Sequence, residues 1–202
     1  FGQWGSVVPP LYGAGFITLN TGKTSVNGSE INLSFQQKSK NIKIQGFVGY
    51  TYANARALEP GRVIGVDNSN SDQTYRNTSS DTTGNVLKYR PKHLAKADVM
   101  LKYKKWTFGL GATYQSAVQN VDMAFVNFPI SAFVPGIQES IDKELTAYTI
   151  YNARMGYAFS KIWQTNLLVA NLFNVEYAIR PADLGSPRSV RLQVTYTIDK
   201  AK

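Results

Sequence analysis

Apolar and polar residues alternate strictly through long stretches of this chain. From Ser189 to Ile198, every even position holds valine, leucine, tyrosine or isoleucine, and every odd position holds serine, threonine, glutamine or arginine. Successive side chains of a β-strand point to opposite faces, so this pattern predicts a strand with one apolar and one polar face. The same alternation predicts strands at about 22–37, 41–55, 94–104, 106–119 and 145–159. A further strand, 162–174, is apolar on both faces near Leu167 to Leu172, which leaves its orientation open.

The connections between these strands alternate between short and long. Lys38–Lys40, Lys104–Lys105 and Ser160–Lys161 form short polar turns, whereas residues 58–87 and 122–144 form long segments. The first long segment is too polar to fold by itself and is predicted to be a loop. Outer-membrane barrels combine strands of about 9–11 residues with short turns at one end and long loops at the other. Strands of β-sandwiches are shorter, at about 5–6 residues, and lack this asymmetry.

The charged residues support a sheet with one lipid-facing side. A lysine or arginine facing lipid at mid-membrane costs about 2–4 kcal/mol. Arg56 shares the apolar side of its strand, but it lies beyond the apolar part, towards the loop. Tyrosine and tryptophan at the strand ends suit an interfacial girdle, the alternative being ordinary packing in a water-soluble barrel. Five basic residues fall on the polar side of their strands: Lys43, Lys96, Lys102, Arg154 and Arg191.

Composition narrows the classes of function. The chain has 202 residues and a net charge of +9, but its lysines and arginines are spread along it rather than clustered, which argues against nucleic-acid binding and suits lipopolysaccharide phosphates or anionic ligands. No apolar run is long enough for a transmembrane helix. The chain has no cysteine, which excludes disulfides and thiolate metal sites.

Catalytic chemistry is not indicated by any motif. His93 is the sole histidine, which excludes multi-histidine metal sites. We interpret His93 as an interfacial residue at an outer strand end; a contact to haem or a metal is the alternative. No phosphate-binding loop or nucleotide fingerprint is present. We therefore expect no enzymatic activity, no cofactor and no bound metal.

The loops supply the candidate binding residues. The segment from Met123 to Ile137 is unusually apolar for an exposed loop. It either folds over the barrel mouth or against its neighbours, or forms a contact surface for an apolar ligand or a partner protein. The polar sides of the strands place Glu30, Arg154 and Arg191 towards the lumen. The predicted ligand-binding residues of the loops are Tyr75, Arg76, Phe125, Phe128, Phe133 and Arg180.

Several motifs together resemble a known family. Val169–Tyr177 reads VANLFNVEY and is followed by Pro187-Arg188 and the alternating strand that ends at Ile198. This order is similar to the C-terminal end of TonB-dependent outer-membrane receptors. Upstream, Gly22–Phe35 and Leu87–Tyr103 resemble two earlier strands of that family. The resemblance extends from Gly22 to Ile198.

The resemblance implies a 22-stranded barrel with a plugged lumen. We accordingly expect an all-β fold, an antiparallel transmembrane β-barrel segment contributing about seven C-terminal strands, with residues 22–198 in the barrel, 1–21 as a loop or partial strand and 199–202 as a tail. In the family, an extracellular ligand of siderophore, haem or cobalamin type docks on loops and plug, and the TonB complex pulls on the plug. The expected location is the bacterial outer membrane.

The implied partners follow from that location. They are the remaining barrel strands, the plug domain contacted by the lumen-facing residues, the TonB complex acting through the plug, and outer-membrane lipid and lipopolysaccharide; a surface lipoprotein stays open. An alternative is a self-contained small barrel acting as an adhesin or structural protein, with Phe16–Leu19 extended into an eighth strand. An outer-membrane lipase or protease is a third hypothesis, against which the lack of a recognisable catalytic constellation argues.

Overall fold

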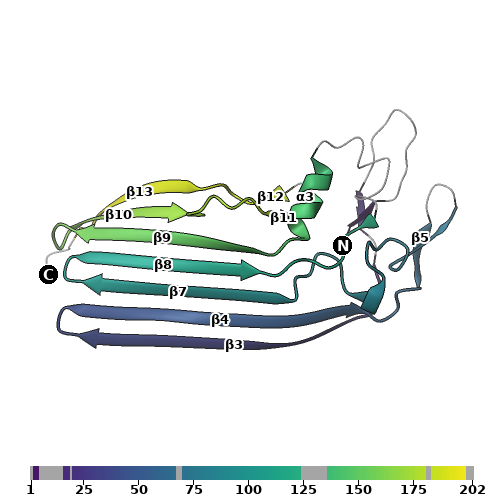
Figure 1. The fold of residues 1–202 in the computed structure, drawn as a ribbon, viewed down its shortest axis with the longest axis horizontal. Coiled ribbons are helices and arrows are strands. Elements are labelled where there is room, and N and C mark those ends of the chain that lie inside the picture. Colours follow the sequence, from purple (N-terminus) through teal and green to yellow (C-terminus); the bar gives the residue numbers. More distant parts are fainter. Residues whose placement is uncertain are drawn as a thin grey trace.

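Seven long strands form one antiparallel sheet in this computed structural model, which describes residues 2–4, 16–18, 20–66, 70–123, 136–180 and 183–198. The order across the sheet is β13-β10-β9-β8-β7-β4-β3, so neighbours in the sequence are neighbours in space (Figure 1). Each of the seven predicted strands is present. Their bounds are β3 Thr24–Ser39, β4 Ile42–Ala57, β7 His93–Tyr103, β8 Trp106–Gln115, β9 Tyr148–Ala158, β10 Trp163–Ala170 and β13 Ser189–Tyr196.

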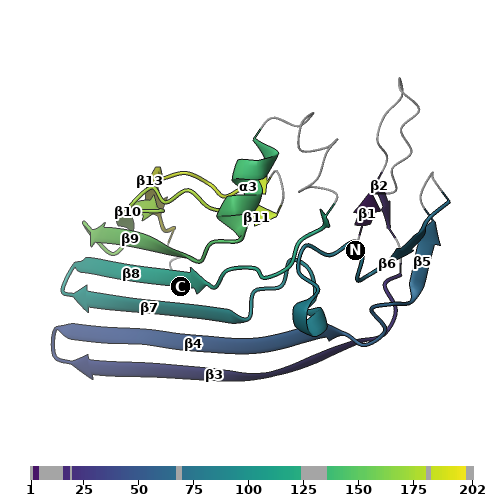
Figure 2. The same cartoon turned by 45° about the vertical axis from the view of Figure 1, so that its right-hand side comes forward.

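The smaller elements gather at the end of the sheet opposite the tight turns, here called the loop end (Figure 1). They are β1 Gly2–Trp4, β2 Phe16–Thr18, β5 Val63–Val66, β6 Asp72–Thr74, the 3-10 turn η1 Thr83–Asn85, the helix α3 Ile137–Glu144, β11 Ala178–Arg180 and β12 Asp183–Leu184. β10 and β13 run in a different direction from β3 and β4 in Figure 2, so the sheet is coiled rather than flat. Among the described residues, none of the helices has the length and apolar content needed to span a membrane.

Two elements differ from the sequence expectations. The long segment 122–144 contains the helix α3, whose apolar residues Ile137 and Ile141, one turn apart, pack against Val118 and Val121. β2 pairs with β1 in a separate two-stranded sheet and, within the described part of the chain, does not add an eighth strand to the large sheet.

One face of the large sheet is apolar and bare. Leu33 pairs with Val48, which pairs with Ala97, so apolar side chains from successive strands lie side by side. Leu33, Leu110 and Leu192 expose 65–67 % of their surface. A continuous patch of large exposed apolar side chains is unfavourable in water and typical of a surface in contact with a membrane. We therefore assign this face of the sheet to lipid.

The register also fixes the orientation of β10, which the sequence pattern leaves open. Leu167 pairs with Met155 and Leu192 and therefore lies on the apolar face. Leu168 lies between Arg154 and Arg191 on the polar face.

Aromatic side chains border the apolar face at both ends. At the end of the sheet that carries the tight turns, here called the turn end, the ring centroids of Trp106 and Tyr157 are 4.6 Å apart, and those of Trp163 and Tyr196 are 4.7 Å apart. Along β8, Trp106 and Tyr114 bracket the band; at about 3.3 Å per residue they lie about 26 Å apart along the strand. An outer-membrane apolar band is about 25 Å tall, so the sheet has the dimensions of a membrane-spanning wall.

Candidate ligand-binding site at the loop end

A buried polar network joins the two loops that flank β7 and β8. The Tyr75 hydroxyl donates to the Val86 carbonyl at 3.0 Å and accepts from the Lys88 backbone N–H at 2.7 Å. The Lys88 ammonium forms an ion pair with Asp122 and donates to Thr78 Oγ1 at 2.9 Å. The side chains of Lys88 and Asp122 are 6 % and 7 % exposed, so this ion pair is shielded from water.

The electrostatics of this network follow from its burial. Burial raises the pKa of Tyr75 to about 12, because the phenolate form loses its hydration. Burial lowers the pKa of Lys88, and the neighbouring Asp122 opposes that shift. Asn120, which is fully buried, completes the network by donating to the Val86 carbonyl at 2.7 Å. Residues 75–88 and 116–122 are thus held as one block, although the first segment is too polar to fold by itself.

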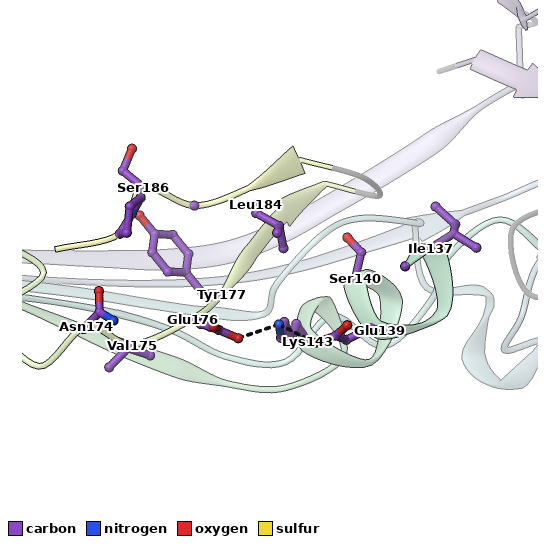
Figure 3. A pocket seen from close by; sticks show the side chains of 13 residues that line it. Ile137, Glu139, Ser140, Lys143, Asn174, Val175, Glu176, Tyr177, Leu184 and Ser186 are labelled. Carbon is purple, nitrogen blue, oxygen red and sulfur yellow. Dashed lines mark hydrogen bonds and ion pairs between the residues drawn. The ribbon is translucent and has the colours of Figure 1, made fainter. Parts of the chain in front are cut away.

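A hollow of about 770 Å³ lies beside this block, between α3 and the connection from β10 to β13 (Figure 3). The Lys143 ammonium, on α3, donates to Glu139 Oε1 at 2.9 Å and to Glu176 Oε2 at 2.7 Å, linking the helix to the connection. The bond to Glu176 and the bond to Glu139 raise the pKa of Lys143, and the same lysine lowers the pKa of Glu176. The lining residues are Gly136, Ile137, Glu139, Ser140, Lys143, Asn174, Val175, Glu176, Tyr177, Leu184, Gly185, Ser186 and Pro187.

The asparagines of the Asn-Leu-Phe-Asn sequence shape one wall of this hollow. Asn171 is 2 % exposed, and its side-chain amide donates to the carbonyls of Val175 at 2.8 Å and Ser186 at 3.1 Å. Asn171 and Asn174 both have positive φ, of 49° and 53°, a conformation that asparagine tolerates better than most residues. Asn174 Oδ1 accepts the Arg188 backbone N–H at 2.8 Å, which connects this sequence to the Pro-Arg element. The two asparagines therefore turn the chain after β10 and hydrogen-bond it to the segment that leads into β13.

Tyr177 connects the same wall to the sheet. A Cβ atom on Gly185 would lie 2.1 Å from the Tyr177 ring, so only glycine permits this close approach. The Tyr177 ring centroid lies 4.6 Å from that of Tyr148, whose hydroxyl donates to Gln115 Oε1 at 3.1 Å. Tyr148 shares its side of β9 with Arg154, so the hollow adjoins the polar face of the sheet.

Neither Tyr75 nor Arg76 lines this hollow. Tyr75 is 4 % exposed, and its hydroxyl is engaged within the loop network. Arg76 is exposed on that block, and Arg180 lies in β11, for which the backbone is described. Phe125, Phe128 and Phe133 lie outside the described residues.

The hollow's charged residues were not among the sequence candidates. Glu139 and Lys143 are separated by four positions, the spacing of an ion pair on a helix, which is the signal that could have identified them. Their partner Glu176 is distant in sequence and carries no such signal. His93 lies on the apolar side of β7, where Tyr50 Oη is 2.7 Å from its Nδ1.

The predicted lumen-facing residues lie on the polar face. The Asn32 side-chain amide donates to Glu30 Oε1 at 2.6 Å, and Arg191 is exposed opposite Leu168. Arg154 reaches across β8 to Asp98 at 2.5 Å, passing over a glycine of β8. Their contact with a plug stays a prediction. The described part of the chain holds no group of three or more histidine, cysteine or acidic residues placed to bind a metal.

These features define a segment of an outer-membrane β-barrel wall. The model of the TonB-dependent receptor-like β-barrel family matches residues 3–175, and the chain belongs to that family. It is thus a protein of the bacterial outer membrane, from a family of transport receptors.

The solved structures similar to the chain include the following two. The ferripyoverdine receptor of the outer membrane of Pseudomonas aeruginosa, bound to ferripyoverdine, matches with a TM-score of 0.51 and 14 % identity over 97 % of this chain. The ferric-catecholate import receptor Fiu of E. coli K12 matches with a TM-score of 0.44 and 15 % identity over 86 % of this chain. The chain spans 23 % and 27 % of these two chains, about a quarter of their length.

Proposed function

We propose that this chain forms the C-terminal wall of a receptor that imports a scarce nutrient through the outer membrane by energised transport. The family match over residues 3–175, on a sheet with one lipid-facing side, carries the proposal. The outer edges of β3 and β13 have no partner strand among the described residues. Unpaired strand edges in lipid cost several kcal/mol for each unsatisfied backbone group, so further barrel strands cover them.

The proposed ligand is of the siderophore, haem or cobalamin type. It is captured at the loop end, where the block around Lys88 provides a fixed support and the hollow beside α3 provides a recess. Arg76 and Arg180 supply positive charge for anionic chelates, and Phe125, Phe128 and Phe133 supply apolar contact. Tyr75 supports these loops from within. The ferripyoverdine receptor, with a similar fold, is a precedent for a siderophore ligand but does not identify the ligand here.

In this proposal, transport needs no covalent chemistry from the chain. A plug domain fills the lumen against Glu30, Arg154 and Arg191, and the TonB complex moves that plug after the ligand has bound. The lipid-facing side contacts outer-membrane lipid and lipopolysaccharide. No cofactor, metal or catalytic residue is assigned to the chain.

The intact mass of the polypeptide in native outer membranes tests the importer against the small barrel. Peptide mapping upstream of Phe1 accompanies the measurement. A chain several-fold heavier with a plug-like N-terminal region supports the importer. A mature chain that starts near Phe1, without a companion chain supplying strands, contradicts it.

Binding of labelled ligands tests the site. Outer membranes containing the whole receptor are titrated with ⁵⁵Fe-loaded hydroxamate, catecholate and pyoverdine chelates, haemin and cobalamin. Lys143→Gln, which unties α3 from Glu176, is expected to weaken binding of the cognate ligand by about tenfold. The matched control Lys161→Gln, in a turn at the opposite end, is expected to leave affinity unchanged. Equal affinity in all three receptors places the ligand elsewhere.

A further inference from the structure

Three lysines stand in one row across the polar face at the turn end. Lys38 on β3 pairs directly with Lys43 on β4, and Lys43 pairs directly with Lys102 on β7. We call these three residues the lysine row. Directly opposed residues of an antiparallel sheet have Cβ atoms about 4.5–5.5 Å apart, and like charges at that spacing destabilise the pair. Salt screens little at this range, since the Debye length is about 8 Å at physiological ionic strength.

No carboxylate in the described part of the chain neutralises this row. The nearest acidic residue on the polar face of β7 is Asp98, four positions before Lys102, and it is bonded to Arg154. Glu30 lies eight positions before Lys38 on β3. Beyond Lys102 the row continues into Thr107 of β8, which is uncharged.

Simple protection of a sheet edge does not explain the row. Lysine on an edge strand discourages unwanted pairing, and β3 is an edge of this sheet. Lys43 and Lys102, however, lie on β4 and β7, which are paired on both sides. Two nearby lysines, in contrast, have partners within the chain. The Lys104 ammonium lies 5.3 Å from the centroid of the Tyr103 ring, and the Lys105 ammonium donates to the Phe159 carbonyl at 3.3 Å.

We infer that the lysine row is a docking site for an acidic polypeptide segment that enters the barrel at the turn end. A segment that presents two or three carboxylates would relieve the repulsion within the row by charge complementarity. Lipid phosphate is the wrong partner, because the row lies on the face opposite the bare apolar side chains of Leu33 and Val48. The inference rests on the proposed function only in taking the polar face to line the lumen.

Carbodiimide coupling tests this inference in the whole receptor within isolated outer membranes. The reagent joins a lysine amine to a carboxylate that already touches it, and mass spectrometry identifies both peptides. We expect links from the lysine row to aspartate or glutamate in a polypeptide segment outside residues 2–198. The triple variant Lys38→Gln, Lys43→Gln, Lys102→Gln is expected to lower their yield at least tenfold, whereas Lys161→Gln retains it. If the triple variant does not assemble, Lys102→Gln alone takes its place.

Three results would overturn the inference. One is that the row forms no links and is acetylated by a small acylating reagent as fast as Lys161, which would make it a solvated surface. Another is that inorganic phosphate or lipopolysaccharide protects the row from the acylating reagent while the row forms no links to carboxylates. The last is links that reach only Glu30 or Asp98. Energised uptake of a labelled ligand is measured on the same receptor, so failure of the docking site is distinguishable from failure of the proposed function.

Discussion

Two adjacent leucines of β10 allow the lipid-facing side to be tested with a single chemical change. Leu167 lies on the apolar face between Met155 and Leu192, and Leu168 lies on the polar face between Arg154 and Arg191. We consider Leu167→Glu and Leu168→Glu in the whole receptor. The two variants have the same composition and differ by one position, so any difference in stability reports the environment of each face.

The expected cost of Leu167→Glu has two parts. A lysine or arginine that faces lipid at mid-membrane costs about 2–4 kcal/mol, and a glutamate costs less. We take about 2 kcal/mol for the glutamate, the lower end of that range. Loss of a leucine side chain from apolar surroundings adds about 1.5–3 kcal/mol. Leu168→Glu is free of the lipid term, although Leu168 is the more buried of the two leucines within the protein, and it gains two opposed arginines, each worth about 0.2–1 kcal/mol. We expect a difference of about 3 kcal/mol, roughly a hundredfold in the folding equilibrium.

Urea titration of the receptor folded into phospholipid vesicles measures this difference. The folded fraction is read from its altered electrophoretic mobility before heating. A markedly lower urea midpoint for Leu167→Glu than for Leu168→Glu is the expected result. Equal midpoints, or a greater loss for Leu168→Glu, would refute the assignment of the two faces.

Three further predictions concern the polar face and the loop block. Gly109→Ala is expected to cost about 1–3 kcal/mol, because its Cβ would lie 2.4 Å from an arginine nitrogen of β9, while Gly61→Ala, in open space, changes stability by less than about 0.5 kcal/mol; urea midpoints compare them. Asp122→Asn leaves Lys88 buried without its counter-ion and is expected to weaken the loop block by about 3–5 kcal/mol, seen as faster hydrogen exchange at residues 75–90. The stability conferred by neutral Tyr75 is complete below pH about 10, its unfolded pKa, and is lost as pH rises through its folded pKa of about 12. Limited proteolysis with an alkaline protease follows this loss. Tyr75→Phe removes the contribution of the tyrosine and leaves that of Lys88, whose pKa burial lowers.

Alternation in the sequence predicts the strands because each residue of a membrane-spanning sheet faces either lipid or the polar side, and its side chain must suit that side. Lipid on one side makes each misplaced charge unfavourable, so the sequence alone places Lys96 and Arg154 on the polar side of their strands. β10 is the exception: Leu167 and Leu168 are both apolar, and only the register with its neighbours separates their faces. The pattern fails where both sides of a strand tolerate the same residue.

The loop end could not be predicted in this way because its contacts are not local. Lys88 meets Asp122 across 34 positions, and Lys143 meets Glu176 across 33. Tyr75 was a reasonable candidate for an exposed contact, since an aromatic residue in a polar loop often binds ligands, yet its hydroxyl fastens the loop from inside. The lysine row likewise follows from register: Lys38 and Lys43 flank one tight turn, but Lys102 joins them only through the pairing of β7 with β4.

Energised uptake by living cells is the most direct test of the proposed import. Cells that carry the whole receptor, cells from which it is deleted and cells that lack TonB are given each labelled ligand of the panel. We predict that one ligand accumulates only in cells with both the receptor and TonB, and that a protonophore stops the accumulation. Accumulation of no ligand above the deleted strain, or equal accumulation with and without TonB, would contradict a role in energised import.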